Sequence, residues 1–118
     1  MTPVIYFGKR LAGECLVYRQ NLEKGPRYLL KQRRDLADYS QTGYGWGRPE
    51  QGPDQDQLAL ALLADALGED EALEWDHDFC EEIVEKLPAE WVMTQERIMD
   101  WYARKAQDRQ LNPAKTAD

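Results

Sequence analysis

The sequence predicts an α+β fold in which an N-terminal antiparallel β-hairpin or small sheet packs on three α-helices. Three observations predict it: short β-branched and aromatic runs near the N-terminus, a long run of Leu and Ala in the middle, and apolar residues at helical spacing in the second half. With 118 residues, of which 42% are hydrophobic, the chain has enough apolar material for one modest core. We therefore expect a single α+β domain over residues 1–108 and a disordered polar tail over residues 109–118.

The predicted hairpin uses residues 4–7 and 14–19, which are rich in β-branched and aromatic side chains and are separated by a glycine-bounded connection. Residues 20–41 are ambiguous. Residues 27–30 fit a third strand, whereas residues 28–39 contain enough Leu, Lys and Arg to form a helix. We favour a strand followed by irregular chain.

Three later segments have helical patterns. Residues 54–67 alternate Leu with Ala, but the run is longer than a typical strand, both residue types favour helix, and Gly68 is placed to end it. We expect this helix to be the central buried one. Residues 70–87 place apolar side chains mainly at spacings of three and four with acids between them, which is typical of an amphipathic helix ended by Pro88. Thr94 is a candidate N-cap for a third helix.

A glycine-rich aromatic segment precedes the Leu/Ala-rich helix and carries a resemblance. The motifs concerned are Trp46-Gly47, Gly52-Pro53 and the run from Gln57 to Ala61, with Tyr6 and Gly8 earlier and Leu87-Pro88 and Trp91 later. They resemble the central block of a small domain-of-unknown-function family found in bacteria, archaea, phages and other mobile elements. The likeness spans most of residues 4–101, and it implies no agreed activity, substrate or catalytic residue.

Charge is distributed unevenly along the chain. The formal net charge is −7, yet residues 1–34 hold eight Lys or Arg against two Glu, whereas residues 48–100 hold three Lys or Arg against sixteen acids. If the fold keeps these segments apart, the molecule is basic at one end and acidic at the other.

The acids of the predicted helix over residues 70–87 lead to our functional prediction. An array of carboxylates can occupy a basic groove that normally holds nucleic acid, with fast electrostatically steered association. We therefore predict a non-catalytic protein-binding module with an acidic surface, most concretely a mobile-element inhibitor of a host nucleic-acid-dependent defence complex, in the manner of an anti-CRISPR protein. The side chains that we expect to bind this host protein are Glu74, Asp78, Glu81, Glu82, Glu85 and Trp46. The simpler interpretation is a solvated helix face.

A nucleic-acid-binding accessory protein is the second interpretation. The aromatic loop with Tyr39, Tyr44 and Trp46 lies beside the basic N-terminal third, where Arg33 and Arg34 could contact phosphates. Two facts oppose it. Aromatic residues next to glycines commonly cover the core of a small domain, and a net charge of −7 disfavours general nucleic-acid affinity.

A small enzyme of unknown class is the third interpretation, but no residue pattern assembles a catalytic set. Glu74-x-x-His77 has the spacing of a metal-binding pair, yet His77 is the only histidine, and Cys80 on an apolar helix face fits the core better than a nucleophile. We predict no catalytic residue, no cofactor and no metal. The oligomeric state stays open.

We expect the protein to be cytoplasmic, with no membrane as partner. No apolar run approaches the ~20 residues that a bilayer span needs, and the first residues lack the apolar region of a signal peptide. Cys15 and Cys80 have no metal-site spacing, and we expect both to be free thiols.

Overall fold

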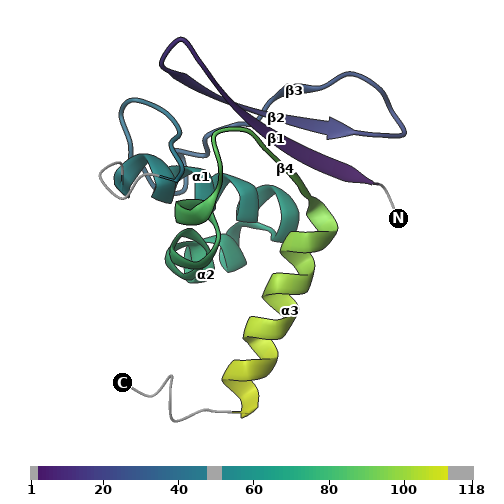
Figure 1. Ribbon diagram of the computed structural model, residues 1–118. Helices are drawn as coiled ribbons and strands as arrows, with labels where there is room; N and C mark the ends of the chain where they lie inside the picture. Colours follow the sequence, from purple (N-terminus) through teal and green to yellow (C-terminus); the bar gives the residue numbers. More distant parts are fainter. Residues whose placement is uncertain (1–2, 48–51, 112–118) are drawn as a thin grey trace.

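The computed structural model describes residues 3–47 and 52–111. These residues form a four-stranded antiparallel sheet with helices on one side of it, so the α+β prediction is confirmed (Figure 1). The strands are β1 (Val4–Leu11), β2 (Glu14–Asn21), β3 (Tyr28–Leu29) and β4 (Trp91–Thr94), in the spatial order β3-β2-β1-β4. The helices are α1 (Gly52–Leu67), α2 (Glu69–Glu82) and α3 (Gln95–Leu111), with the 3-10 turn η2 (Val84–Lys86) after α2.

The predicted hairpin is confirmed, and its strands are longer than predicted. β1 and β2 pair along their whole lengths and leave only a two-residue turn between them. We expected Gly8 to begin the connection, but it lies inside β1, opposite Val17 of β2 and Trp91 of β4. A side-chain carbon at Gly8 would lie 2.2 Å from Nε1 of Trp91, so the glycine makes room for the indole ring.

The two edge strands differ more from the prediction. β3 contains only Tyr28 and Leu29, and the favoured irregular chain follows it. β4 was not predicted: it pairs antiparallel with the other edge of β1. β4 ends at Thr94, where α3 begins, and Thr94 Oγ1 accepts a hydrogen bond of 3.0 Å from the backbone N–H of Arg97. The N-cap prediction is therefore confirmed.

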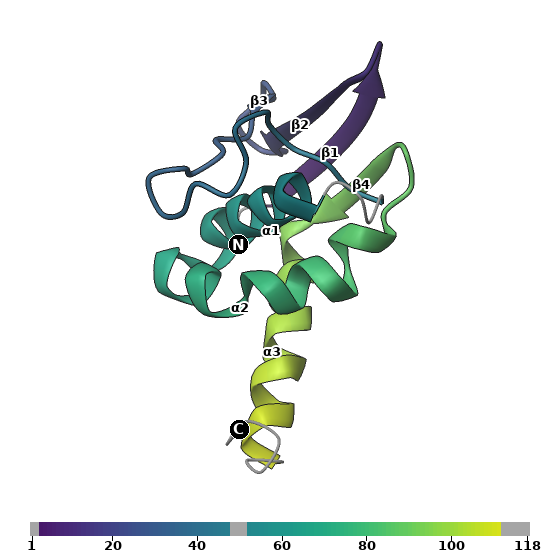
Figure 2. The same cartoon turned by 90° about the vertical axis from the view of Figure 1, so that its left-hand side faces the viewer.

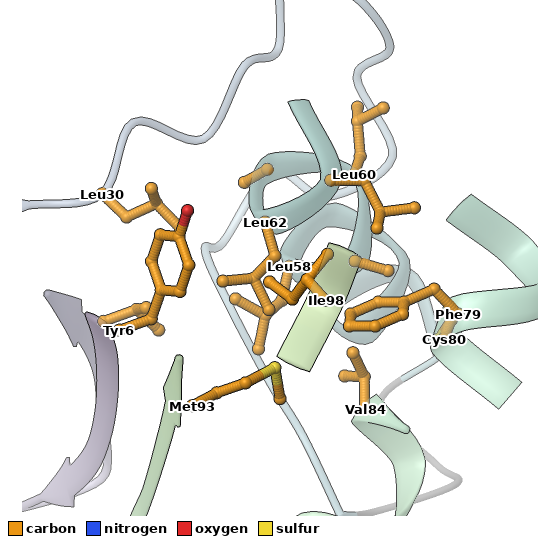
Figure 3. Close-up of a cluster of buried hydrophobic side chains, with 14 of the residues drawn as sticks. Tyr6, Leu30, Leu58, Leu60, Leu62, Phe79, Cys80, Val84, Met93 and Ile98 are labelled. Atoms are coloured by element: carbon orange, nitrogen blue, oxygen red, sulfur yellow. The ribbon is translucent and has the colours of Figure 1, made fainter. Parts of the chain in front are cut away.

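Helix α1 is the centre of the core, as predicted. Its residues 58–64 are all buried. Figure 3 shows Leu58 and Leu62 of this helix beside Met93 of β4 and Ile98 of α3, all within one buried cluster. Because Leu and small Ala side chains lie on all sides of α1, the helix packs between the sheet and the other helices.

The helix predicted over residues 70–87 is shorter in the structure. α2 ends before Ile83, where the chain turns into η2. The carbonyl of Val84 in η2 accepts a hydrogen bond of 3.1 Å from the backbone N–H of Gly47, so this turn holds the segment before α1. A side-chain carbon at Gly47 would lie 2.3 Å from the carbonyl oxygen of Leu87, which explains why glycine follows tryptophan here.

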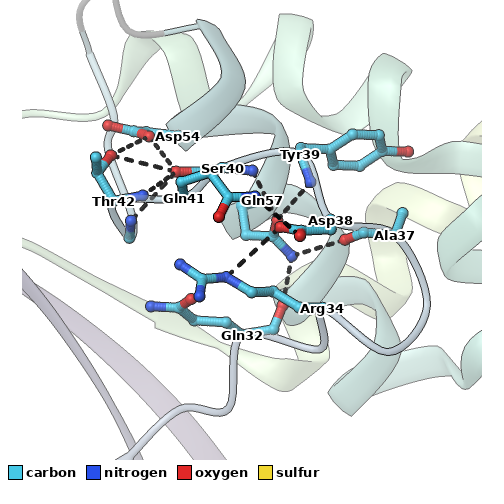
Figure 4. A network of polar contacts seen from close by, with 11 residues as sticks. Gln32, Arg34, Ala37, Asp38, Tyr39, Ser40, Gln41, Thr42, Asp54 and Gln57 are labelled. Atoms are coloured by element: carbon cyan, nitrogen blue, oxygen red, sulfur yellow. Dashed lines mark hydrogen bonds and ion pairs between the residues drawn. The ribbon is translucent and has the colours of Figure 1, made fainter.

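The irregular segment between β3 and α1 is fixed to α1 by the buried Gln57 and by Asp54, which accepts hydrogen bonds from the hydroxyls of Ser40 and Thr42 (Figure 4). The side-chain N–H groups of Gln57 donate to the carbonyls of Gln32, at 2.6 Å, and Ala37, at 3.1 Å. Its carbonyl oxygen accepts from the backbone N–H groups of Tyr39, at 2.9 Å, and Ser40, at 3.1 Å. All four bonds satisfy backbone groups that have no strand or helix partner. Gln57 therefore supplies the hydrogen bonds that a strand or helix would otherwise give to this segment.

The C-terminal boundary also differs from the prediction. α3 continues to Leu111, so residues 109–111, which we assigned to the tail, are helical. Residues 112–118 lie outside the described residues, and the rest of the tail stays a prediction. Within the described part of the chain, every helix is too short or too polar to cross a membrane.

Candidate binding face of the sheet

One side chain from each strand forms a continuous row on the face of the sheet that points away from the helices. The strand register pairs Leu29 with Tyr18, Tyr18 with Phe7, and Phe7 with Val92. Residues directly opposite each other share a face, so these four residues form one line across the sheet, which we name the outer row. Figures 1 and 2 show the helices only on the opposite side, and Leu29 and Val92 are 56% and 64% exposed.

Arg27 lies over the centre of the outer row. Its guanidinium carbon is 5.5 Å from the ring centroid of Phe7 and 5.1 Å from that of Tyr18, within the range of a cation–π contact. Lys9 lies on the same face, two residues along β1 from Phe7 and opposite Leu16. Neither Arg27 nor Lys9 forms an ion pair within the described residues, so both charges face solvent without a neutralising acid.

Other bases of the N-terminal third are used to hold the fold. Arg19 Nε donates to Asp65 of α1 at 2.7 Å, and the same carboxylate accepts a 2.6 Å hydrogen bond from the hydroxyl of Tyr6. This network joins β1 and β2 to α1 on the inner face of the sheet. Further ion pairs link Arg33 to Asp35 and Glu69, and Arg34 to Asp38. The basic run in the sequence therefore divides into bases that are paired and bases that are free.

The acids that we predicted at a partner interface are divided in the same way. Glu74 pairs with Arg109 of α3 at 2.6 Å. Glu82 pairs with Lys105 at 2.6 Å and also accepts a 3.1 Å hydrogen bond from Nε1 of Trp101. Burial alone would raise the pKa of Glu82, but the hydrogen bonds from Lys105 and Trp101 outweigh it and hold that pKa below its ordinary value. Glu74 and Glu82 thus fasten α2 to α3.

The remaining predicted acids differ in their exposure to solvent. Glu81 is exposed and forms no ion pair among the described residues. Asp78 and Glu85 are partly buried, and Glu85 Oε2 lies 4.0 Å from Sγ of the buried Cys80. The charge run of α2 therefore leaves a smaller free acidic surface than the sequence suggests.

Trp46, the aromatic residue that we predicted to anchor a partner, is part of the core. Its side chain is 0% exposed and packs edge-on against Trp91, with 5.7 Å between the ring centroids. Arg10 covers the ring and donates to the Trp46 carbonyl. Tyr44 is also buried, and its hydroxyl donates to the Leu30 carbonyl at 3.0 Å. The aromatic loop is therefore not an exposed stacking platform, because its rings close the core below the hairpin.

The residues considered for catalysis do not form a reactive set. Burial and the nearby carboxylates raise the pKa of the Cys80 thiol, which keeps it protonated and weakly nucleophilic. His77 is 69% exposed at its side chain, with Nδ1 3.5 Å from Asp56 Oδ1. Glu74 instead faces Arg109, so the Glu74-x-x-His77 spacing does not create a shared site. Within residues 3–47 and 52–111, no group of three His, Cys, Asp or Glu residues is placed to hold a metal ion.

Sequence reasoning missed the outer row, although a signal for it exists. Apolar residues stand at consecutive positions in residues 4–7 and 15–18, so apolar side chains fall on both faces of each strand. An antiparallel sheet with one face in water normally alternates apolar and polar residues. The absence of alternation indicates a second apolar face, but the row itself requires β4 and the register, which only the structure supplies.

Comparison with known proteins gives a family. The chain belongs to a family of unknown function, DUF6166, whose model matches residues 6–104. The match spans the sheet and the helices together, and so confirms the resemblance seen in the sequence. No curated protein and no solved structure matches the chain.

Proposed function

We propose that this protein is a non-catalytic binding module that contacts a macromolecular partner through the outer row. The observation that carries the proposal is the register of Leu29, Tyr18, Phe7 and Val92, which places four partly or largely exposed apolar side chains in one line across an uncovered sheet face. Single exposed apolar residues are ordinary on protein surfaces, whereas a contiguous apolar patch with polar residues around it marks an interaction site. A partner that covers this row removes apolar area from water, which favours binding.

The acidic surface of α2 is the second candidate, and it retains the prediction of a host protein with a basic groove. Glu81 favours it, because this carboxylate is exposed and unpaired within the described part of the chain. The ion pairs of Glu74 and Glu82 with α3 weaken this second candidate. To bind a partner, each acid would have to break its ion pair within the protein and form a new one with a base of the partner. A cytoplasmic inhibitor carried by a mobile element stays part of this second proposal.

Site-specific photo-cross-linking in the producing cells tests which surface binds. A photoreactive amino acid replaces Val92 on the outer row, and matched variants carry it at Leu73 or at Glu81 on α2. Leu73 is a suitable control because it is also an exposed apolar residue, at 45%, but lies on a helix. We expect adducts from position 92 and none from position 73. Adducts from position 81 alone would show that the acidic surface of α2, and not the outer row, binds the partner. Equal adducts from positions 92 and 73 would overturn the proposal.

A further inference from the structure

We propose that the partner of the outer row is a single-stranded nucleic acid, whose bases stack on Phe7 and Tyr18. This inference rests on the proposed function, because it names the partner of the same face. The two rings are directly opposite each other on the two central strands, so they form a neighbouring pair and not two isolated aromatics. Sheets that bind single strands use aromatic side chains of this kind as stacking platforms for two or three bases.

The dimensions of the face suit a short stretch of nucleic acid. Adjacent strands lie about 4.8 Å apart, so the outer row spans roughly 14 Å from β3 to β4. The aromatic pair occupies the middle, and Leu29 and Val92 extend it at both edges with apolar side chains. A row of this length accommodates two or three nucleotides, with the aliphatic ends in contact with base or sugar.

The charges around the rings also match a nucleic acid. Arg27 already lies over both rings, and a base that stacks there moves its guanidinium towards the adjoining phosphate. Lys9 supplies a second cation on the same face. The pairs that flank the outer row directly are Lys9 with Leu16, and Ile5 with Gln20 and Thr94, and none of them contains an acid. The nearest acids further along are Glu14, opposite Leu11 on this face, and Glu90, which immediately precedes β4.

The acids of α2, which contribute much of the net charge of −7, do not strongly oppose this partner at the sheet. The acidic helix α2 packs against α1, and α1 lies between it and the sheet (Figure 1). One helix has a diameter of about 10–12 Å, which exceeds the Debye length of about 8 Å at physiological ionic strength. Salt therefore screens the acids of α2 from a strand bound on the opposite side, while Arg27 and Lys9 act at contact distance.

A second copy of this chain fits the same face less well. A symmetric dimer through the outer row would place the same surface on both sides of the interface. Such an interface would bring together the Arg27 and Lys9 cations of both copies, and the pairs that directly flank the outer row hold no acid to neutralise them. Phosphates supply the opposite charge directly, so the free bases favour nucleic acid over self-association.

Fluorescence anisotropy with labelled single-stranded oligonucleotides tests the inference. The full chain is titrated against a 12-nucleotide oligo-dT and an oligo-U of equal length, at low and physiological salt, with duplex DNA as competitor. We expect dissociation constants in the range of about 1–100 μM at physiological salt, tighter at low salt, and weak competition by duplex. No binding at either salt, or equal binding to duplex and single strand, would overturn stacking on the outer row.

Two variants with matched controls locate the site. Tyr18→Leu keeps an apolar side chain but removes the ring, and we expect the dissociation constant to rise about tenfold, since stacking contributes about 1–3 kcal/mol per base. Arg27→Gln should weaken binding and reduce the magnitude of the salt slope by about 0.7, the value for one phosphate contact on a single strand. The controls are Tyr28→Leu, on the other face of the same strand pair, and Arg104→Gln on α3. Equal losses in the variants and the controls would contradict the inference.

The two proposals fail in different ways. If the oligonucleotides do not bind but position 92 still forms adducts with a protein, the outer row is a binding face and only the nucleic-acid inference is wrong. If adducts with a second copy of the chain appear, the face is a homodimer interface. If neither binding nor adducts occur, both proposals fail together.

Discussion

The two faces of the sheet come from the same strands, but they have opposite surroundings. On the inner face, Tyr6, Val17 and Met93 are almost completely buried against the helices. On the outer face, Leu29 and Val92 keep more than half of their surface in solvent. Because side chains alternate along a strand, these two environments are one residue apart. Local sequence therefore shows that a strand is apolar, but it does not show which face of the strand the helices bury.

Polar groups show the same contrast. On the inner face the hydroxyl of Tyr6 and the guanidinium of Arg19 both bind the carboxylate of Asp65. On the outer face the cations of Arg27 and Lys9 have no acidic partner among the described residues. The inner face stabilises the fold, whereas the outer face leaves apolar side chains exposed and two cations without an acidic partner among the described residues. The four predictions below test this division, from the largest expected effect to the smallest.

Shortening a side chain on each face should give the largest difference. Met93→Ala removes a buried side chain from the inner face, and we expect a loss of about 2–5 kcal/mol in the free energy of unfolding. Val92→Ala, its neighbour on the outer face, should change that free energy by less than about 0.5 kcal/mol. Chemical denaturation measured by tryptophan fluorescence compares the two. A similar loss in both variants would show that the outer row belongs to the core.

Removing a hydroxyl from each face gives an intermediate contrast. Tyr6→Phe deletes a hydroxyl that donates to Asp65 at 2.6 Å and accepts from Gln95 at 3.0 Å. Burial and the nearby carboxylate raise the pKa of Tyr6, so the neutral donor is present at all ordinary pH values. We expect a loss of about 1.5–3 kcal/mol, as for hydrogen bonds to charged groups.

Tyr18→Phe is the matched change on the outer face. The Tyr18 hydroxyl makes no hydrogen bond to any described residue, so thermal and chemical denaturation should agree with the wild type within about 0.5 kcal/mol. The ring stays available for stacking. A destabilisation equal to that of Tyr6→Phe would mean that the Tyr18 hydroxyl also stabilises the fold, and that the outer face is not free of structural contacts.

The helical layer behind the inner face should show a small pH effect. The pKa of Glu82 is depressed in the folded protein, so its contribution is complete above the ordinary value of 4.5 and is lost as pH falls through the lower folded value. Glu82→Gln should therefore lower stability at neutral pH by about 0.2–1 kcal/mol, since the pair with Lys105 is partly solvent-exposed. Its stability should also fall less steeply on acidification.

Glu81→Gln is the control for this pH dependence. Glu81 is the preceding residue on α2, and it is exposed and unpaired within the described residues. Its removal should leave the acid side of the stability profile unchanged. If pH titrations of unfolding give the same profile for both variants, the Glu82–Lys105 pair does not carry the expected linkage.

How much of the fold could be predicted depends on the range of the interactions. The hairpin, α1 and the Thr94 cap follow from local patterns of apolar, glycine and capping residues, and all were predicted. β4 is only four residues long, and it is stabilised by pairing with β1, which lies near the other end of the sequence. The end of α2 at Glu82 was missed for a similar reason, because the apolar spacing continues although the chain turns towards the segment before α1.

The candidate site shows the same limit. The acids of α2 form an obvious run in the sequence, but their partners Lys105 and Arg109 lie on α3, and only the fold brings them together. We predicted Trp46 as a partner contact, although aromatic residues next to glycines commonly cover the core, and the structure buries its ring completely. The outer row needs the register of four strands, so its members could be recognised as strand residues but not as one surface.

Arg27→Gln should have only a small effect on stability, and its smallness is what makes the substitution informative. Arg27 is exposed, and a cation–π contact at such a site contributes about 0.5–1 kcal/mol at most. Arg109→Gln is the comparison on the helical side, where the guanidinium lies 3.8 Å from the ring centroid of the buried Trp75 and also pairs with Glu74. We expect Arg109→Gln to destabilise more than Arg27→Gln in parallel thermal melts. If the order is reversed, Arg27 stabilises the fold and is not a free cation of the outer face. If the order holds, a change in binding caused by Arg27→Gln reflects contact with the partner and not a loss of folding.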